Sequence, residues 1–140
     1  MAVIYLHGCT LKDVTINEPR SGVYGIWICE NGQNITIDGL NLTAERGIKI
    51  ADEDANKEAV TLNIANAEFT TKKKAAILTT VSDGATINAG EGINIANVTA
   101  DTENLVWVDE ERAEEYYKVT TTDAKMTPET KESDYTNTSF

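Results

Sequence analysis

The sequence predicts an all-β fold in which short parallel strands stack in successive coils, and three observations lead to this prediction. An eight-residue pattern of alternating apolar and polar residues recurs at residues 9–16, 35–42, 62–69 and 93–100. Its copies start 26, 27 and 31 residues apart, a spacing typical of stacked repeats. A shorter apolar pattern follows each copy, at residues 25–28, 47–50, 74–77 and 105–108. Hydrophobic residues make up 41% of the chain and aromatic residues only 6%, which favours a thin aliphatic core.

Each eight-residue copy is expected to form two short strands joined by a sharp bend. Period-two alternation places successive side chains on opposite faces of a strand. In every copy the alternation is interrupted by a residue type that tolerates a left-handed backbone, namely Asp13, Gly39, Asn66 and Asn97. On either side of the bend, one column of apolar side chains should point inward: Leu11, Ile37, Ile64 and Ile95 before it, and Val14, Leu40, Ala67 and Val98 after it.

The shorter pattern is expected to supply the next strand of each coil. In the second, third and fourth copies its first inward residue lies six positions after the copy ends, at Ile48, Ala75 and Val106. The outward column is then Tyr5, Trp27, Lys49, Ala76 and Trp107. Residues 4–6 match the same pattern ahead of the first copy, so the chain opens in the middle of a coil. We therefore expect residues 1–126 to form one domain that is a fragment of a longer solenoid.

A β-sandwich built from the same short strands is the alternative fold. It requires hairpin turns at strand ends, and the Asn31-Gly32 and Asp83-Gly84 steps make two of them possible. Parallel stacking is favoured, because no single coil can bury its own apolar face and successive coils bury it together.

The repeated order of strand, bend, strand, turn and strand over residues 3–109 resembles the right-handed parallel β-helix of the pectate-lyase-like proteins. The resemblance implies a right-handed parallel β-helix of about four coils, in line with the general preference for right-handed crossovers. It says little about activity. Residues 46–49 (RGIK) and His7-Gly8 match only loosely the Arg-Ile-Lys and Gly-His-Gly motifs of polygalacturonase-like members, and the Asn-Thr-Asp and Asp-Asp motifs are absent.

Charge and composition exclude several classes of partner. The net charge is −11, with 23 acidic and 12 basic residues, so nucleic acid is not an expected partner.

No stretch approaches the roughly 18 apolar residues of a membrane span, and residues 1–6 are too short and uncharged for a signal peptide. We expect an extracellular or cell-surface protein from which this chain is cut. No cofactor is expected.

The cysteines and acidic turns give no strong metal or disulfide signal. Cys9 falls on an inward position and Cys29 starts a long turn, which favours two free thiols. Metal-ligand spacing is absent. Glu30, Asp52 and Asp54 lie in neighbouring turns and could converge on a hard cation, but a solvated turn is the simpler interpretation.

The chain changes character after residue 108. Residues 109–118 are rich in helix formers and acids, which favours a short closing helix. Residues 119–126 are compatible with one more strand or with coil. Residues 127–140 are polar and are expected to form a disordered tail or linker.

Two surfaces are candidates for function. Aromatic side chains on a solvent-facing column suggest stacking on sugar rings, and a lysine among them can meet a carboxylate or make a cation–π contact. The candidate carbohydrate-binding residues are Tyr5, Trp27, Lys49 and Trp107. The alternative is that another segment covers them. Polar columns on the other strands (Thr10, Thr36, Asn63 and Asn94; Thr15, Asn41, Glu68 and Thr99) are best explained as stabilising cross-strand pairs.

Three functional hypotheses follow. The first is a non-catalytic scaffold or carbohydrate-binding module of a bacterial surface, secreted or phage-tail protein, with a polysaccharide or glycan as partner. The second is a partial or degenerate polysaccharide lyase or hydrolase. Glycoside hydrolysis needs two separated carboxylates. An enzyme built on this chain would require Asp38 or Asp52 near Arg46 or Lys49. The third is a coil stack that associates end to end, either with copies of itself or with further coils of a longer chain.

Overall fold

The computed structural model describes residues 1–28, 34–51, 61–73, 75–80, 92–102, 104–108 and 119–127. Within these ranges the chain is all-β, with ten strands and no helix, and none of their segments is a helix that could cross a membrane. The strands are β1 (Ala2–Leu6), β2 (Thr10–Asn17), β3 (Tyr24–Ile28), β4 (Asn34–Ala44), β5 (Arg46–Ala51), β6 (Thr61–Thr71), β7 (Ala75–Thr80), β8 (Ile93–Asp101), β9 (Asn104–Val108) and β10 (Val119–Thr127). The helix expected at 109–118 lies outside the described residues, and so does the tail expected at 127–140 except for Thr127, which belongs to β10.

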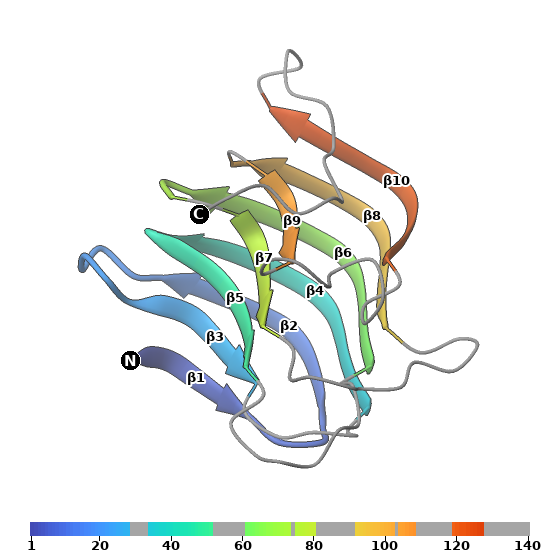
Figure 1. Cartoon of the computed structure of the whole chain (residues 1–140), viewed down its shortest axis with the longest axis horizontal. Helices are drawn as coiled ribbons and strands as arrows, with labels where there is room; N and C mark the ends of the chain where they lie inside the picture. The colour runs from blue at the N-terminus through green and yellow to red at the C-terminus, as the bar shows by residue number, and fades with distance from the viewer. Residues whose placement is uncertain are drawn as a thin grey trace.

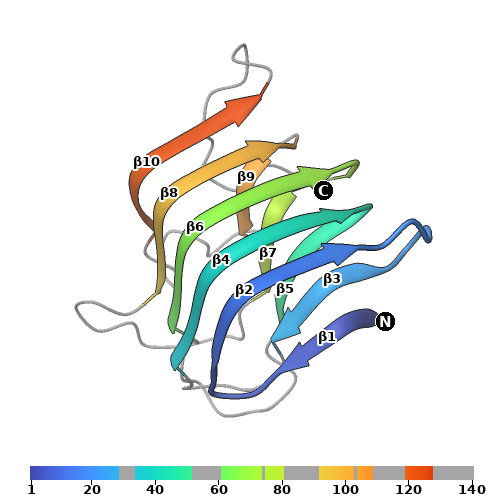
Figure 2. The same cartoon turned by 180° about the vertical axis from the view of Figure 1, so that it is seen from behind.

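Successive strands alternate between two five-stranded sheets (Figures 1 and 2). Sheet A has the order β1-β3-β5-β7-β9, and sheet B has the order β10-β8-β6-β4-β2. Every strand pairing in the described ranges is parallel. Each strand therefore pairs with the strand two places along the chain, an arrangement compatible with a parallel β-helix. The hairpins that a β-sandwich requires are not formed by these strands, and Gly32 and Gly84 lie outside the described ranges.

The predicted bends occur at the predicted residues. Asp13, Gly39, Asn66 and Asn97 have φ angles of 51°, 80°, 54° and 52°, which is left-handed backbone. One aspect of the prediction is wrong, because each copy forms one bent strand rather than two short strands. The pairing register continues on both sides of the bend, as in Lys12 opposite Asp38 and Val14 opposite Leu40. A single left-handed residue thus turns the strand without ending its ladder.

The core is a set of aliphatic columns between the two sheets. The inward columns of sheet B are buried in its interior strands, with Ile37 and Ile64 exposed by 1% or less. Sheet A supplies Ile26, Ile48, Ile77 and Val106, which follow one another in register and are 0% exposed. Full burial of such a side chain contributes about 1.5–3 kcal/mol. The repeated columns therefore hold neighbouring coils together along the whole stack.

Sheet B ends in a fifth bent strand, β10, which does not match the eight-residue sequence pattern. β10 pairs with β8 in the same register as the other copies, with Val119 opposite Ile93 and Ala124 opposite Val98. Asp123 has a φ of 53°, so it is a fifth bend residue. Thr121 occupies the position that is apolar in the other copies, which obscured the repeat. β10 also includes Thr127, one residue beyond the predicted domain boundary.

The predicted register of β7 is wrong by two residues. Ile48 lies opposite Ile77 rather than Ala75, and Lys49 lies opposite Leu78 rather than Ala76. The cause is the length of the preceding turn. Only Glu45 separates β4 from β5, whereas residues 72–74 separate β6 from β7. A prediction that places β7 as far behind its eight-residue copy as β5 lies behind its own is therefore two residues too early.

Candidate functional site

The outer face of sheet A carries the predicted aromatic column, with one change. Register places Tyr5 opposite Trp27, Trp27 opposite Lys49, and Lys49 opposite Leu78. Trp107 follows Leu78 on β9. Leu78 therefore stands where Ala76 was expected, and it separates Trp107 from Lys49.

A second outer column lies beside the first, and it was not predicted from the sequence. Its members are Ala2, Tyr24, Arg46, Ala75 and Asn104. Tyr24 and Trp27 can share a face because Gly25, between them, comes close to the core: a Cβ on Gly25 would lie 2.5 Å from Leu42 Cδ1. The signal that could have revealed this column is the Tyr-Gly and Arg-Gly pairs at the starts of β3 and β5.

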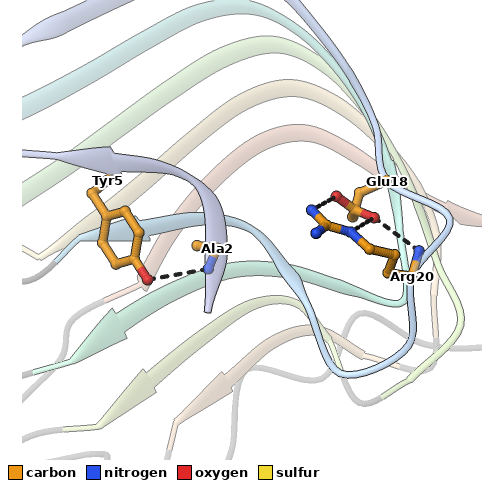
Figure 3. A network of polar contacts seen from close by, with 4 residues as sticks. All are labelled: Ala2, Tyr5, Glu18 and Arg20. Carbon is orange, nitrogen blue, oxygen red and sulfur yellow. Dashed lines mark hydrogen bonds and ion pairs between the residues drawn. The ribbon is translucent and has the colours of Figure 1, made fainter.

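Five residues from the two columns form a contiguous aromatic–cation cluster: Tyr5, Tyr24, Trp27, Arg46 and Lys49. The Tyr5 and Trp27 rings stack with centroids 6.0 Å apart, and Tyr24 meets Trp27 edge to face at 5.8 Å. Lys49 Nζ lies 3.9 Å from the Trp27 ring centroid, and Arg46 Cζ lies 5.2 Å from that of Tyr24. The Tyr5 hydroxyl accepts a hydrogen bond from the Ala2 amide at 3.3 Å (Figure 3).

Exposure determines which surfaces of the aromatic–cation cluster a ligand could reach. Tyr5, on the outermost strand of sheet A, is 50% exposed. Trp27 is half-buried, because Tyr5 stacks on it from β1 and Lys49 covers it from β5. Trp107 is only 7% exposed and packs with Leu78, so its ring offers little surface to a ligand. The accessible part of the predicted site is therefore Tyr5 together with the half-buried Trp27 and Lys49.

Among the described residues, the cluster holds two cations without counterions. The side chains of Arg46 and Lys49 make no ion pair in the described part of the chain, and the two outer columns contain no carboxylate. Arg46 Nε and Trp27 Nε1 are buried and have no hydrogen-bond partner among the described residues. In a chain of net charge −11, the described residues of these two columns thus carry positive charge only.

Of the two carboxylates that the enzyme hypothesis allows, the structure describes only Asp38, which lies in the other sheet from Arg46 and Lys49. Asp38 lies on β4 in sheet B, where it accepts a hydrogen bond from Asn66 Nδ2 at 2.7 Å. Arg46 and Lys49 lie on β5 in sheet A. Asp52, Glu30 and Asp54 fall outside the described residues, so the acidic turn is not placed. Within the part of the chain that the structure describes, no three metal-ligating side chains form a group.

The first polar column of sheet B shows one of the predicted cross-strand contacts. Asn94 Nδ2 donates to Asn63 Oδ1 at 2.9 Å. At the bends, Asn97 Nδ2 donates to Asn66 Oδ1 at 2.8 Å, and Asn66 in turn donates to Asp38. These are cross-strand contacts that fix register. Cys9 is a free, partly buried thiol beside the core, as expected, and Cys29 lies outside the described residues.

Two ion pairs secure the turns from sheet B to sheet A, and neither was expected from the sequence. Glu18 accepts hydrogen bonds from Arg20 Nε at 2.7 Å and Nη2 at 2.6 Å (Figure 3). These bonds lower the pKa of Glu18 to about 2. Glu45 pairs with Lys73 Nζ at 2.8 Å and accepts the Gly22 amide. Hydrogen bonds from Lys73, Ser21 and Gly22 lower the pKa of Glu45 to about 2. Both carboxylates have structural partners.

In comparisons with known proteins, no family model, no curated protein and no solved structure matches this chain.

Proposed function

We propose that this chain is a non-catalytic, right-handed parallel β-helical scaffold of the pectate-lyase-like architecture, and that it belongs to a bacterial surface, secreted or phage-tail protein. The proposal is supported by the repetition of one unit: the left-handed bend recurs in all five strands of sheet B, at residues 13, 39, 66, 97 and 123. Such a stack is stabilised coil by coil. It suits a rigid stalk better than a catalytic pocket.

The aromatic–cation cluster is the part of this scaffold that we assign to carbohydrate binding. Tyr5 presents a half-exposed ring for sugar stacking, and Lys49 and Arg46 are cations without a counterion in the described chain. A sugar that carries a carboxylate would satisfy both features, because the ring can lie against Tyr5 while the anion meets the cations. Trp107 contributes to this site only if its ring becomes accessible.

The test is tryptophan fluorescence with acrylamide quenching, in the Trp107→Phe variant so that Trp27 is the only reporter. Quenching is measured alone and with a panel of neutral and carboxylated polysaccharides. We expect a carboxylated polysaccharide to shift the emission and reduce quenching, and neutral polysaccharides to do so less. Lys49→Ala should abolish the response, whereas Lys72→Ala, which removes an exposed lysine from a turn, should leave it intact. No response to any polysaccharide would reject carbohydrate binding and leave the scaffold role.

A further inference from the structure

Lys49 covers the Trp27 ring without holding a counterion. The two residues lie opposite each other on β5 and β3, which are interior strands of sheet A. Lys49 Nζ is 3.9 Å from the Trp27 ring centroid and 5.7 Å from that of Tyr24, so the ammonium lies close to two aromatic rings. Among the described residues it makes no ion pair. Lys49 therefore occupies aromatic surface that a sugar would need for stacking.

The neighbours of Lys49 in its column are apolar or aromatic and offer the ammonium no carboxylate. In register, Trp27 lies on one side of Lys49 and the buried Leu78 on the other. Lys73 is the contrasting case, because its ammonium binds the Glu45 carboxylate at 2.8 Å. A carboxylate is the stronger partner, since its hydrogen bond to an ammonium is charge-assisted, whereas a cation over an exposed ring is held weakly. An anion that reaches this face should therefore draw Lys49 away from Trp27.

Arg46 provides a second cation close to the first. It lies on the same strand, β5, and its Cζ is 5.2 Å from the Tyr24 ring centroid. Both cations thus approach the same tyrosine ring, Arg46 at 5.2 Å and Lys49 at 5.7 Å. The long side chain of a lysine is flexible, so a carboxylate held by Arg46 would lie within reach of the Lys49 ammonium. Recognition of the anion and movement of Lys49 off the Trp27 ring would then occur at one place.

We propose that Lys49 determines the specificity of this site for carboxylated sugars: it closes the Trp27 ring when no anion is bound, and a carboxylate opens the ring by drawing the ammonium away. A neutral sugar has to displace Lys49 without offering it another partner, so its affinity is reduced by the cost of opening the ring. A carboxylated sugar supplies that partner. Stacking on Trp27 is thus coupled to recognition of the anion, and this coupling rests on the carbohydrate binding proposed above.

The first test uses no sugar. In the Trp107→Phe variant, which serves as the parent chain, acrylamide quenching of Trp27 is measured in sodium acetate and in sodium chloride at equal ionic strength. Screening is then the same in both salts, and acetate should increase quenching because its carboxylate draws Lys49 off the ring. Lys49→Ala should show high quenching in both salts. Lys72→Ala, which changes an exposed residue of a turn, should respond to acetate as the parent does.

The second test uses alginate, polygalacturonate and hyaluronate, each beside its methyl ester, which keeps the sugar chain and removes the charge. In the parent, the carboxylated forms should protect Trp27 from acrylamide and the esters should do so less. In Lys49→Ala this preference should reverse, with the esters binding about two- to fivefold more tightly than they bind the parent, the factor for removing one exposed cation–π contact. Lys49→Arg keeps a cation beside the ring and should retain the preference for the carboxylated forms.

Two results would overturn the role of Lys49 and leave carbohydrate binding in place, provided that carboxylated polysaccharides protect Trp27 in the parent. One is equal quenching of the parent in acetate and in chloride. The other is an affinity of the esters for folded Lys49→Ala no higher than for the parent, with folding checked by circular dichroism. If no polysaccharide protects Trp27 in the parent or in any variant, carbohydrate binding is rejected and the coupling with it.

Discussion

Gly47 and Ala76 are in close backbone contact across the β5–β7 pairing: a Cβ on Gly47 would lie 2.0 Å from the Ala76 carbonyl oxygen. No side-chain rotation relieves such a contact, because its partner is backbone. We therefore predict that Gly47→Ala destabilises the protein by about 3 kcal/mol, the upper part of the range for overpacking. The change is measured by urea unfolding followed by circular dichroism.

Gly22→Ala is the matched control for this prediction. Gly22 has a φ of +78° and nothing within 4 Å of an added Cβ. Its substitution costs only the left-handed backbone, about 1–2 kcal/mol. Equal losses in the two variants would mean that β5 and β7 move apart easily at Gly47.

A second prediction concerns the bend at Asn66, whose φ is 54°. Asn66→Val puts a β-branched residue into left-handed backbone and also removes the hydrogen bonds to Asp38 and Asn97. We expect a loss of about 2 kcal/mol, within the range for backbone strain. Asn66→Gly removes the same hydrogen bonds but tolerates the backbone, so it should cost clearly less. If the two variants unfold at the same urea concentration, the loss of the side-chain hydrogen bonds to Asp38 and Asn97, rather than backbone strain, accounts for the destabilisation.

A third prediction concerns pH. The pKa of Glu45 is lowered from 4.5 to about 2 by hydrogen bonds from Lys73, Ser21 and Gly22. A carboxyl group with a lowered pKa in the folded state stabilises the protein above its unfolded pKa, and this contribution is lost as pH falls through the folded value. Glu45→Gln should therefore be less stable than wild type at pH 7, and the difference should shrink between pH 4.5 and 2. Urea unfolding at several pH values measures it, with the exposed Glu68→Gln as control. If the difference in unfolding free energy between wild type and Glu45→Gln stays constant down to pH 2, ionisation of Glu45 is not the source of that difference.

A fourth prediction tests the cover over Trp27. Lys49 Nζ lies 3.9 Å from the centroid of its ring. In the Trp107→Phe background, Lys49→Ala should increase acrylamide quenching of Trp27 and reduce stability by about 0.5–1 kcal/mol, the value of an exposed cation–π contact. Lys73→Ala is not a suitable control because Lys73 binds Glu45, so Lys72→Ala serves instead. Unchanged quenching would show that Lys49 spends little time over the ring.

The parts of this fold that follow local chemistry could be predicted from the sequence. Asp13, Gly39, Asn66 and Asn97 were recognised as bend residues because few residue types adopt left-handed backbone. The inward columns of sheet B follow from alternation. The register of β7 could not be predicted, because residues 72–74 lengthen a turn whose size has no local signature. β10 was left open between strand and coil, because Thr121 replaces an apolar residue in the repeat pattern at a position that is only partly buried.

The candidate site was predicted only in part. Tyr5, Trp27 and Lys49 were correctly placed in one column because β1, β3 and β5 follow equal spacings. Tyr24 and Arg46 were missed, because simple alternation cannot place residues three apart on one face. Glu45 was missed for a different reason: its partners Gly22 and Lys73 are contributed by the turns of two other coils.

The constant register between strands two places apart makes the coil a unit that can be removed or copied whole. Deleting residues 62–92 would take out β6 and β7 and bring Ile35 opposite Ile93 and Ile48 opposite Val106, with every remaining column intact. The number of coils can therefore change while the packing within each coil stays the same. A gene that encodes such a chain can lengthen or shorten its product in steps of one coil, because each added coil packs against its neighbours through the same columns of side chains.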